Sequence, residues 1–311
     1  MEKRSTKNKR FIVLIILLSI LLISTFTINI LYCGKMQKIN KDYQNLQNEY
    51  NEKKLKEKEL TEEINTIQKK QEDIENIVQN ITNLKKEYYS SIKQLEDEIL
   101  AGKLDKKIAY LTFDDGPYYA SYQFLDILDR YDVKATFFTI GTGKESCYDN
   151  KNYDCTAIYA EEAKRGHTIA NHTFNHAIFK GLYDSPQSFI TQIKKQENLI
   201  KEKTGITTNI IRFPGGSRTA GSKKDGIVTL LRESGYGWVD WSSEIGDGGN
   251  LTSKEQAWKY FTSSINENIE VILMHDYHPI TLSILPDAIE YLKTNGYILL
   301  PLFYESNMVN K

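Results

Sequence analysis

Two adjacent aspartates, Asp114 and Asp115, are the first residues in this chain whose placement suggests chemistry. They follow the apolar run 108–111 and precede Gly116 and Pro117, so they stand where a buried strand ends in a sharp turn. Adjacent carboxylates repel each other, and successive strand side chains point in opposite directions. One aspartate can therefore face a metal ion while the other faces a reacting group. The alternative is an ordinary turn rich in Asp, Gly and Pro.

The five histidines all lie at or after position 167, and two of them, His172 and His176, are four residues apart. That spacing predicts that both imidazoles lie on one face of a helical turn. With the carboxylate of Asp115 they form an N,N,O set, which is typical of a catalytic zinc or similar ion that keeps a position open for water. Surface helices often produce the same spacing without a metal. We interpret His167 as structural and leave His278 without a role.

Further candidates stand at the ends of later apolar runs. Arg212 can form a bidentate contact with the carboxylate of Asp114 and keep it ionised, although a purely structural ion pair is the alternative. Gly215 and Gly216 permit a close approach of the backbone, so an N–H group there can stabilise an oxyanion. A plain turn would also use these glycines.

His275 ends the run 271–275 and is a candidate general acid if a carboxylate raises its pKa. The stretch 238–247 offers Trp241 as an apolar or sugar-stacking wall of the site, although tryptophans are more often core residues. The same stretch holds three carboxylates that compete as the partner of His275, and we favour the last of them: Asp240, Glu244 and Asp247.

The scaffold for these residues is a regular alternation of short apolar runs and amphipathic segments. We expect strands at 108–113, 134–140, 167–171, 209–213, 236–242, 270–275 and 297–303. We expect helices at about 119–131, 156–165, 186–203, 225–234, 252–267 and 284–294. Strands that alternate with helices imply an α/β fold with a parallel sheet. Seven such units suggest a closed or nearly closed barrel with its site at the C-terminal strand ends, and a doubly wound open sheet is the alternative.

The composition of the N-terminal part predicts a membrane-spanning segment. Residues 11–32 are apolar and long enough for one transmembrane helix, and the basic tail 1–10 predicts a cytoplasmic N-terminus and an extracellular head. A cleaved signal peptide is the rival, although no small-x-small site follows. Cys33 resembles a lipoprotein cysteine, but Tyr32 precedes it where a small residue is expected.

Residues 35–101 lack proline and, after Gly34, lack glycine until Gly102. Apolar side chains recur there at alternating steps of four and three, which predicts a helical coiled-coil stalk and a homodimer. A solvated single helix or a partly disordered linker is the alternative. The catalytic domain is then 105–311, and we expect a fragment that starts near Leu104 to fold, because no motif lies upstream.

Composition adds two points. The formal net charge of −1 gives no electrostatic argument for nucleic acid. Cys147 and Cys155 form an even pair that is free to oxidise outside the cell, so we expect a disulfide in the loop between the second strand and its helix.

Five motifs in order resemble the polysaccharide deacetylases of carbohydrate esterase family 4, the NodB-homology domain, over about residues 106–305. They are Thr112–Pro117, His172–His176, Arg212–Gly216, the stretch from Asp240 to Asp247, and Leu273–His275. The resemblance implies a distorted (β/α)7–8 barrel with one divalent ion, most often zinc, with cobalt, nickel or manganese as alternatives.

The resemblance also implies a role for each matching residue. Asp114 would be the general base, His275 the general acid, Arg212 the residue that positions the base, and Asp247 the partner of the acid. The metal ligands would be Asp115, His172 and His176, with Thr173 buttressing their loop. Gly215, Trp241 and Leu273 would contact the substrate, with Gly215 donating its N–H to the oxyanion. Two departures stand out: many members have Tyr or Arg in place of Gly215, and the fourth motif aligns loosely.

The activity implied is metal-dependent removal of N-acetyl groups from an acetylated cell-wall polysaccharide. For an enzyme anchored at the cell membrane we favour N-acetylglucosamine of peptidoglycan. The rivals are another N-acetylated polysaccharide, N-acetylmuramic acid, O-acetyl groups on xylan, and a catalytically silent wall-binding or scaffolding module.

Overall fold

The protein is described here from a computed structural model that covers residues 2–141, 147, 149–304 and 306. The chain divides into two compact units, Met1–Asn83 and Leu84–Lys311. Helix α1 (Glu2–Leu100) makes up the described part of the first unit and opens the second. It ends where the sequence predicts, just before Gly102, whose φ of +67° favours glycine.

The first unit contains a helical segment, from Phe11 onward, that is apolar and long enough to cross a membrane. Because it lies near the N-terminus, it is equally suited to a membrane anchor and to a signal sequence. The heptad positions farther along are exposed on the single chain, among them Leu60, Ile64, Ile67, Ile74, Val78 and Ile81. The domain limits given above, the coiled coil and the dimer stay predictions.

The second unit is built around one parallel sheet. Its strands are β1 (Lys107–Asp114), β2 (Thr136–Thr139), β3 (Thr168–Asn171), β4 (Ile210–Ile211), β5 (Gly237–Trp238), β6 (Ser243–Glu244), β7 (Ile269–His275) and β8 (Tyr297–Leu299). Their order is β5-β4-β3-β2-β1-β7-β6, with β8 paired to the first residues of β1. Residues 239–242 join β5 at one edge to β6 at the other, so the chain itself bridges the gap. The α/β distorted half-barrel confirms the fold expected from the sequence.

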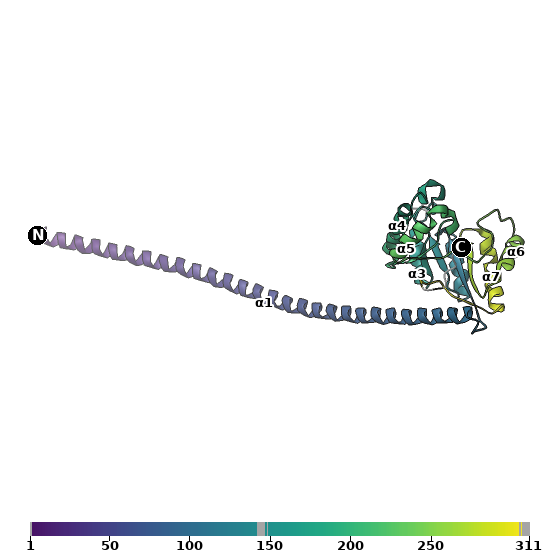
Figure 1. The fold of residues 1–311 in the computed structure, drawn as a ribbon. Coiled ribbons are helices and arrows are strands. Elements are labelled where there is room, and N and C mark those ends of the chain that lie inside the picture. Colours follow the sequence, from purple (N-terminus) through teal and green to yellow (C-terminus); the bar gives the residue numbers. More distant parts are fainter. Residues whose placement is uncertain (1, 142–146, 148, 305, 307–311) are drawn as a thin grey trace. The chain divides into compact units, whose positions relative to one another are not determined.

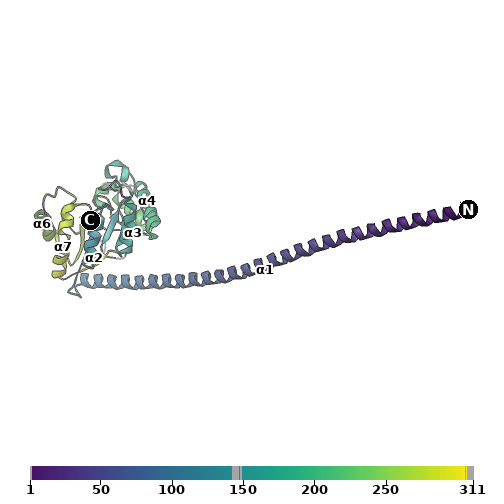
Figure 2. The same cartoon turned by 180° about the vertical axis from the view of Figure 1, so that it is seen from behind.

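Helices cover the outer face of this sheet in the same circular order as the strands. They are α2 (Ser121–Arg130), α3 (Thr156–Lys164), α4 (Pro186–Thr204), α5 (Lys224–Glu233), α6 (Lys254–Ser264) and α7 (Pro279–Thr294). Neighbouring helices contact each other in the series α5-α4-α3-α2-α7-α6. In Figure 1 and again from behind in Figure 2, α3 and α4 lie to one side of the strands and α6 and α7 to the other.

The alternation of side chains along the strands decides which residues reach the barrel interior. On β1, Tyr110 belongs to the interior apolar cluster, whereas Leu111 and Phe113 pack toward the helices. Asp114 is four residues beyond Tyr110, so the period of two places it on the interior side. The register pairs it with His275 at the end of β7. The last residues of adjacent strands thus bring two candidate catalytic groups together.

Several sequence-based boundaries differ from the structure, and two of these differences have a clear physical reason. The strand expected at 236–242 is two short strands, because the backbone changes partner within it: Val239 N–H bonds to Ile211 on the β4 side, and Ser242 N–H to Val271 on β7. The helix expected at 284–294 begins earlier, at Pro279, because the His278 ring accepts the Ile280 N–H and caps the helix.

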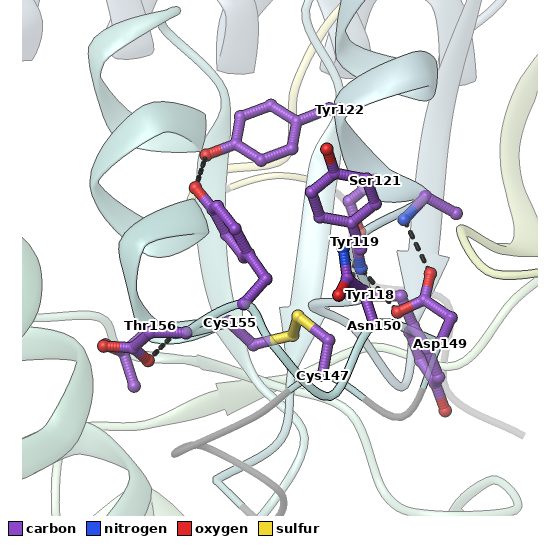
Figure 3. The surroundings of a disulfide bond; sticks show 12 residues. Tyr118, Tyr119, Ser121, Tyr122, Cys147, Asp149, Asn150, Cys155 and Thr156 are labelled. Atoms are coloured by element: carbon purple, nitrogen blue, oxygen red, sulfur yellow. Dashed lines mark hydrogen bonds between the residues drawn. A yellow bond between two sulfur atoms is a disulfide. The ribbon is translucent and has the colours of Figure 1, made fainter.

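The predicted disulfide is present between Cys147 and Cys155, and both cysteines are buried (Figure 3). Within the bridged loop, the Asp149 carboxylate accepts the backbone N–H groups of Tyr119 and Ala120 at 2.8 Å each. The loop is thereby tied to the turn that follows the two aspartates of β1.

The last turns of α1 are part of the second unit's core. Ile92, Glu96 and Ile99 are buried, and Ile99 joins the interior cluster that contains Tyr110. The Glu96 carboxylate accepts the hydroxyl of Tyr110. These turns therefore cover the end of the barrel opposite the strand ends that carry the candidate catalytic residues. This packing argues against a fragment that starts near Leu104 folding on its own.

We expect Ile99→Ala to lower the free energy of unfolding of the second unit by about 2–5 kcal/mol, because it empties a buried site. Leu84→Ala, on the same helix but 64% exposed, is the matched control and should change it by less than about 0.5 kcal/mol. Thermal and denaturant unfolding of both variants, and of fragments 84–311 and 105–311, measures the effect. Equal stability of the two fragments would show that α1 is dispensable.

Candidate active site

The turn after β1 points the two aspartates in different directions. Asp114 is the last residue of β1 and is buried inside the barrel, whereas Asp115 leaves the strand with a φ of +70° and stays partly exposed. Gly116 follows in a tight place, because a Cβ there would lie 2.8 Å from both carboxylate oxygens of Asp276. A side chain at position 116 would require the buried Asp276 carboxylate to move, which favours glycine after the two aspartates.

His172 and His176 are not on a helical turn, contrary to the expectation from their spacing. Residues 172–177 form an irregular loop with left-handed backbone at Thr173 and His176. Side-chain bonds to the backbone hold it: Asn171 Oδ1 accepts the Thr173 N–H, and Thr173 Oγ1 accepts the His176 N–H. Such local bonds compete with helix formation. They still bring the two rings to a centroid distance of 5.0 Å.

The three expected ligands meet at one point. Asp115 Oδ1 lies 3.5 Å from His172 Nε2 and 3.2 Å from His176 Nε2, and all three donor atoms are within 4.8 Å of one another. Two atoms bound about 2.1 Å from one ion at a tetrahedral angle are about 3.4 Å apart, so the spacing fits. Asp115 Oδ1 is buried and accepts no hydrogen bond within the described part of the chain. The donor set is suited to a divalent metal ion.

His172 is prepared as a ligand by its surroundings. Its Nδ1 lies 2.9 Å from the backbone carbonyl oxygen of Arg212, which fixes the proton on Nδ1 and leaves Nε2 as the free donor. Burial, together with the neighbouring charge of His176, lowers the pKa of His172 to about 3. The ring is therefore neutral at physiological pH, as a metal ligand must be.

Arg212 is fully buried and contacts Asp114, as expected, but the contact is not bidentate. Its Nη1 alone donates to Asp114 Oδ1 at 2.8 Å and also to Thr112 Oγ1 at 2.7 Å. Nε donates to the carbonyl oxygen of Val239 and Nη2 to that of Asp240. Burial raises the pKa of Asp114, and the Arg212 charge only partly offsets that rise. The free oxygen, Oδ2, lies 3.6 Å from His172 Nε2 and so faces the ligand cluster.

His275 stands beside Asp114, at the end of the neighbouring strand β7, and is held by Asp247. The two carboxylate oxygens of Asp247 accept the ring Nδ1–H and the backbone N–H of His275, each at 2.8 Å, and Thr281 Oγ1 donates to Oδ2 as well. Burial disfavours the charged ring, but Asp247, with help from Asp114 and Asp115, outweighs it and raises the pKa of His275 to about 9. The imidazole is therefore charged at neutral pH, with Nε2–H directed away from Asp247.

Of the three carboxylates that competed for His275, the other two lie elsewhere. Asp240 accepts the N–H and the hydroxyl of Ser217 at 2.8 and 2.6 Å, so it holds the segment after Gly216. Glu244 lines the cavity but is not bonded to His275.

A cavity of about 450 Å³ lies over the cluster. Its walls include the three residues expected to contact substrate: Gly215, Trp241 and Leu273. Gly215 has a φ of +73°, and the Trp241 ring lies close to Gly216, where a Cβ would be 3.1 Å from the ring. The residues expected to bind metal or contact substrate all line this one cavity, together with Asp114 and His275, whereas Arg212 and the buried Asp247 do not.

Sequence reasoning missed the role of Asp276, which follows His275. It is fully buried, accepts the Ser121 hydroxyl, and packs against Gly116, so it joins the β7 end to the turn after β1. Burial raises its pKa to about 7. Tyr277 was also missed: it lines the cavity and its ring centroid is 5.6 Å from that of His275. The position of Asp276 directly after the candidate acid His275 was a signal that the sequence offered. No sequence signal marked Tyr277.

Comparison with known proteins agrees with this geometry. The polysaccharide deacetylase family model matches residues 101–236. The peptidoglycan-N-acetylglucosamine deacetylase of Bacillus cereus is 30% identical over 198 residues, which are 62% of this chain and 68% of that protein. The bifunctional xylanase/deacetylase of Pseudobutyrivibrio xylanivorans is 31% identical over 199 residues, 62% of this chain but only 29% of that longer protein.

Among solved structures, the catalytic domain of a peptidoglycan N-acetylglucosamine deacetylase from Eubacterium rectale superposes with a TM-score of 0.60 at 34% identity, covering 66% of this chain and 93% of that one. The sequence similarity, the fold and the Asp-His-His cluster agree. This chain belongs to the polysaccharide deacetylase family of metal-dependent hydrolases.

Proposed function

We propose that the protein removes N-acetyl groups from N-acetylglucosamine residues of peptidoglycan. The observation that carries the proposal is the arrangement around one cavity: a three-ligand cluster with a carboxylate held by arginine on one side and a histidine held by carboxylate on the other. Hydrolysis of an amide needs a base for water and an acid for the amine, and these two groups match those needs.

The metal would be held by Asp115, His172 and His176, with zinc favoured over cobalt, nickel and manganese because two imidazoles and one carboxylate suit it. When bound, such an ion supplies Lewis-acid chemistry and lowers the pKa of water. Asp114 acts as the base: Arg212 fixes Oδ1, so Oδ2 faces the cluster and accepts the proton of the attacking water.

The other half of the reaction belongs to residues that follow β4 and to residues of β7 and the segment before β6. The Gly215 N–H donates to the oxyanion that forms when water adds to the amide carbonyl. His275 then gives its Nε2 proton to the departing amine, while Asp247 keeps the ring oriented and charged. Trp241 and Leu273 supply apolar surface for the sugar ring and the acetyl methyl group.

The location proposed for this reaction is the outer face of the cell membrane. The apolar helix at 11–32 would be an uncleaved anchor with a cytoplasmic tail at 1–10, and residues 35–101 would be a stalk that pairs through its heptad seam. Peptidoglycan is then the nearest acetylated polymer. Support comes from the Bacillus cereus and Eubacterium rectale proteins, whose names specify peptidoglycan N-acetylglucosamine.

Replacing His176 with Ala removes one of three protein ligands, so bound metal should fall from about one ion per chain toward zero, and activity should fall with it. Elemental analysis of the purified protein measures this. His278→Ala is the matched control, because that ring caps α7 and lies outside the ligand cluster. Full metal content in His176→Ala would remove this residue from the ligand set.

Replacing Asp114 with Asn keeps the shape and the contact to Arg212 but removes the proton acceptor. Metal content should stay close to one ion per chain while kcat falls by about 10²–10⁴-fold. His275→Ala should also keep its metal and should lose less activity on an activated ester than on an amide, because that leaving group departs with less help. If Asp114→Asn loses metal and Asp115→Asn retains it, the two aspartates have been assigned the wrong way round.

The substrate is tested by acetate release from peptidoglycan, chitin oligomers and acetylated xylan, with metal-loaded protein. The highest kcat/KM is expected on peptidoglycan, with free amines appearing on glucosamine and not on muramic acid in the digested product. Preferential release from xylan would move the assignment to O-deacetylation. No release from any of the three would favour a silent wall-binding module.

A further inference from the structure

The ladder between β1 and β7 ends at the two groups proposed to move protons. The last residues that its register pairs are Asp114 and His275. Asp115, the carboxylate of the ligand cluster, comes one residue later, where the backbone turns away with a φ of +70°. The strand pairing therefore fixes Asp114 against His275 but does not extend to Asp115.

Asp276 continues the contact between the two strands beyond the end of their ladder. Its carboxylate is fully buried, and one oxygen, Oδ2, accepts the hydroxyl of Ser121 at the start of α2. Both oxygens lie directly against Gly116, since a Cβ there would be 2.8 Å from each of them. Gly116 and Ser121 are the two ends of the turn that follows Asp115. The side chain of Asp276 thus holds this turn at both ends.

Other hydrogen bonds hold the same turn from different directions. The carbonyl oxygen of Gly116 accepts the N–H of Ile140, just after β2, at 2.9 Å. Ser121 Oγ accepts the N–H of Tyr118 at 2.9 Å, so the hydroxyl that binds Asp276 also closes the turn on itself. These two bonds tie the turn to β2 and to α2. Asp276 adds an attachment to β7 that they do not provide.

A buried carboxylate is a costly way to hold a turn. Taking a charge out of water costs free energy that only good hydrogen bonds offset. Oδ1 of Asp276 accepts no hydrogen bond from the residues that the structure describes. Burial raises the pKa of Asp276 to about 7, although the Ser121 hydroxyl and the charge of His275 act in the opposite direction. Stability alone therefore does not account for a carboxylate at this position, whereas the placement of the adjoining ligand does.

We propose that Asp276 is a positioning residue for the metal site, because it fixes the turn after Asp115 against the strand that carries His275. The inference rests on the proposed function in one respect, namely that Asp115, His172 and His176 are the ligands. Its consequence is that the metal affinity depends on a side chain that does not bind the metal. The shape of the Asp276 side chain and its acceptor for Ser121 matter for this role, and its charge does not.

The test measures the Kd of the purified full chain for Zn²⁺ by competition with a chromophoric chelator. Asp276→Ala should raise this Kd by about tenfold, because the turn loses its attachment to β7. Asp276→Asn should recover most of the affinity, since it keeps the shape and an oxygen that can accept the Ser121 hydroxyl.

The Ser121 hydroxyl provides a second, independent variant. Ser121→Ala removes the partner of Asp276 and should raise the Kd for Zn²⁺ by about threefold, the effect of one ordinary hydrogen bond. In a protein that already carries Asp276→Ala, the same change should have a smaller effect, because the two residues act through one contact.

Glu270→Ala is the matched control for lost stability. Glu270 is a fully buried carboxylate near the other end of β7, where it accepts the N–H groups of Asn266 and Glu267 at 2.7 Å each. Its loss should lower the free energy of unfolding but leave the Kd for Zn²⁺ within about twofold of the wild type, because it is far from the cluster. The absorption spectrum of the Co²⁺-loaded protein reports ligand geometry; it should change in Asp276→Ala and not in Glu270→Ala.

An unchanged Kd in Asp276→Ala overturns the inference, and so does an equal rise in Glu270→Ala. A rise in Asp276→Asn as large as that in Asp276→Ala also overturns it, because the charge would then be what matters. If Asp276→Ala does not fold, an unchanged Kd in Ser121→Ala is decisive against it. Asp115→Ala separates the inference from the proposed function: full Zn²⁺ binding there contradicts the ligand set and the inference with it, whereas lost binding there with an unchanged Asp276→Ala contradicts the inference alone.

Discussion

The buried guanidinium of Arg212 is the contact on which both the fold and the site depend. Its side chain reaches from β4 across the barrel interior to Thr112 and Asp114 on β1, and to the carbonyl oxygens of Val239 and Asp240. Those carbonyls belong to the segment that bridges the gap between β5 and β6. Arg212 therefore ties three parts of the barrel together at the place where no strand ladder closes it.

The same residue sets the geometry of the ligand cluster. Its side chain fixes one oxygen of Asp114, and its backbone carbonyl accepts the Nδ1–H of His172. A buried arginine is tolerated only when its donors are satisfied, and here each of its three nitrogens has a partner. Because Asp114 is in direct contact with the guanidinium, Asp114 and Arg212 stabilise each other's charge. One residue therefore contacts both the proposed base, Asp114, and one of the proposed metal ligands, His172.

Much of this site could be predicted from the sequence because strand periodicity and fold topology carry the information. Asp114, Arg212 and His275 end apolar runs, and the ends of parallel strands meet at one face of a barrel. The conformation of the His172–His176 loop could not be predicted, since side-chain bonds from Asn171 and Thr173 set it and override the helical spacing. The choice among three carboxylates for His275 also depended on contacts between segments distant in sequence.

The end of α1 illustrates a different limit. An apolar stripe such as Ile92 and Ile99 predicts a buried face, but periodicity does not say what covers it. The same pattern of apolar side chains can pack against a coiled-coil partner or against the bottom of a barrel. In this chain the stripe up to about Ile81 is exposed, whereas the last turns enter the core beneath Tyr110. One continuous pattern therefore serves two different packing environments.

Three carboxylates at one site are suited to different tasks because they differ in how their oxygens are occupied. Asp247 accepts three hydrogen bonds, so it has little capacity left for a proton and acts through His275. Asp114 has one oxygen bound and one free, which suits proton transfer in a fixed direction. Asp115 Oδ1 is buried beside two imidazole nitrogens and accepts no hydrogen bond from the residues that the structure describes, which suits a metal ion. The environment of each oxygen, more than the residue type, distinguishes the three acids.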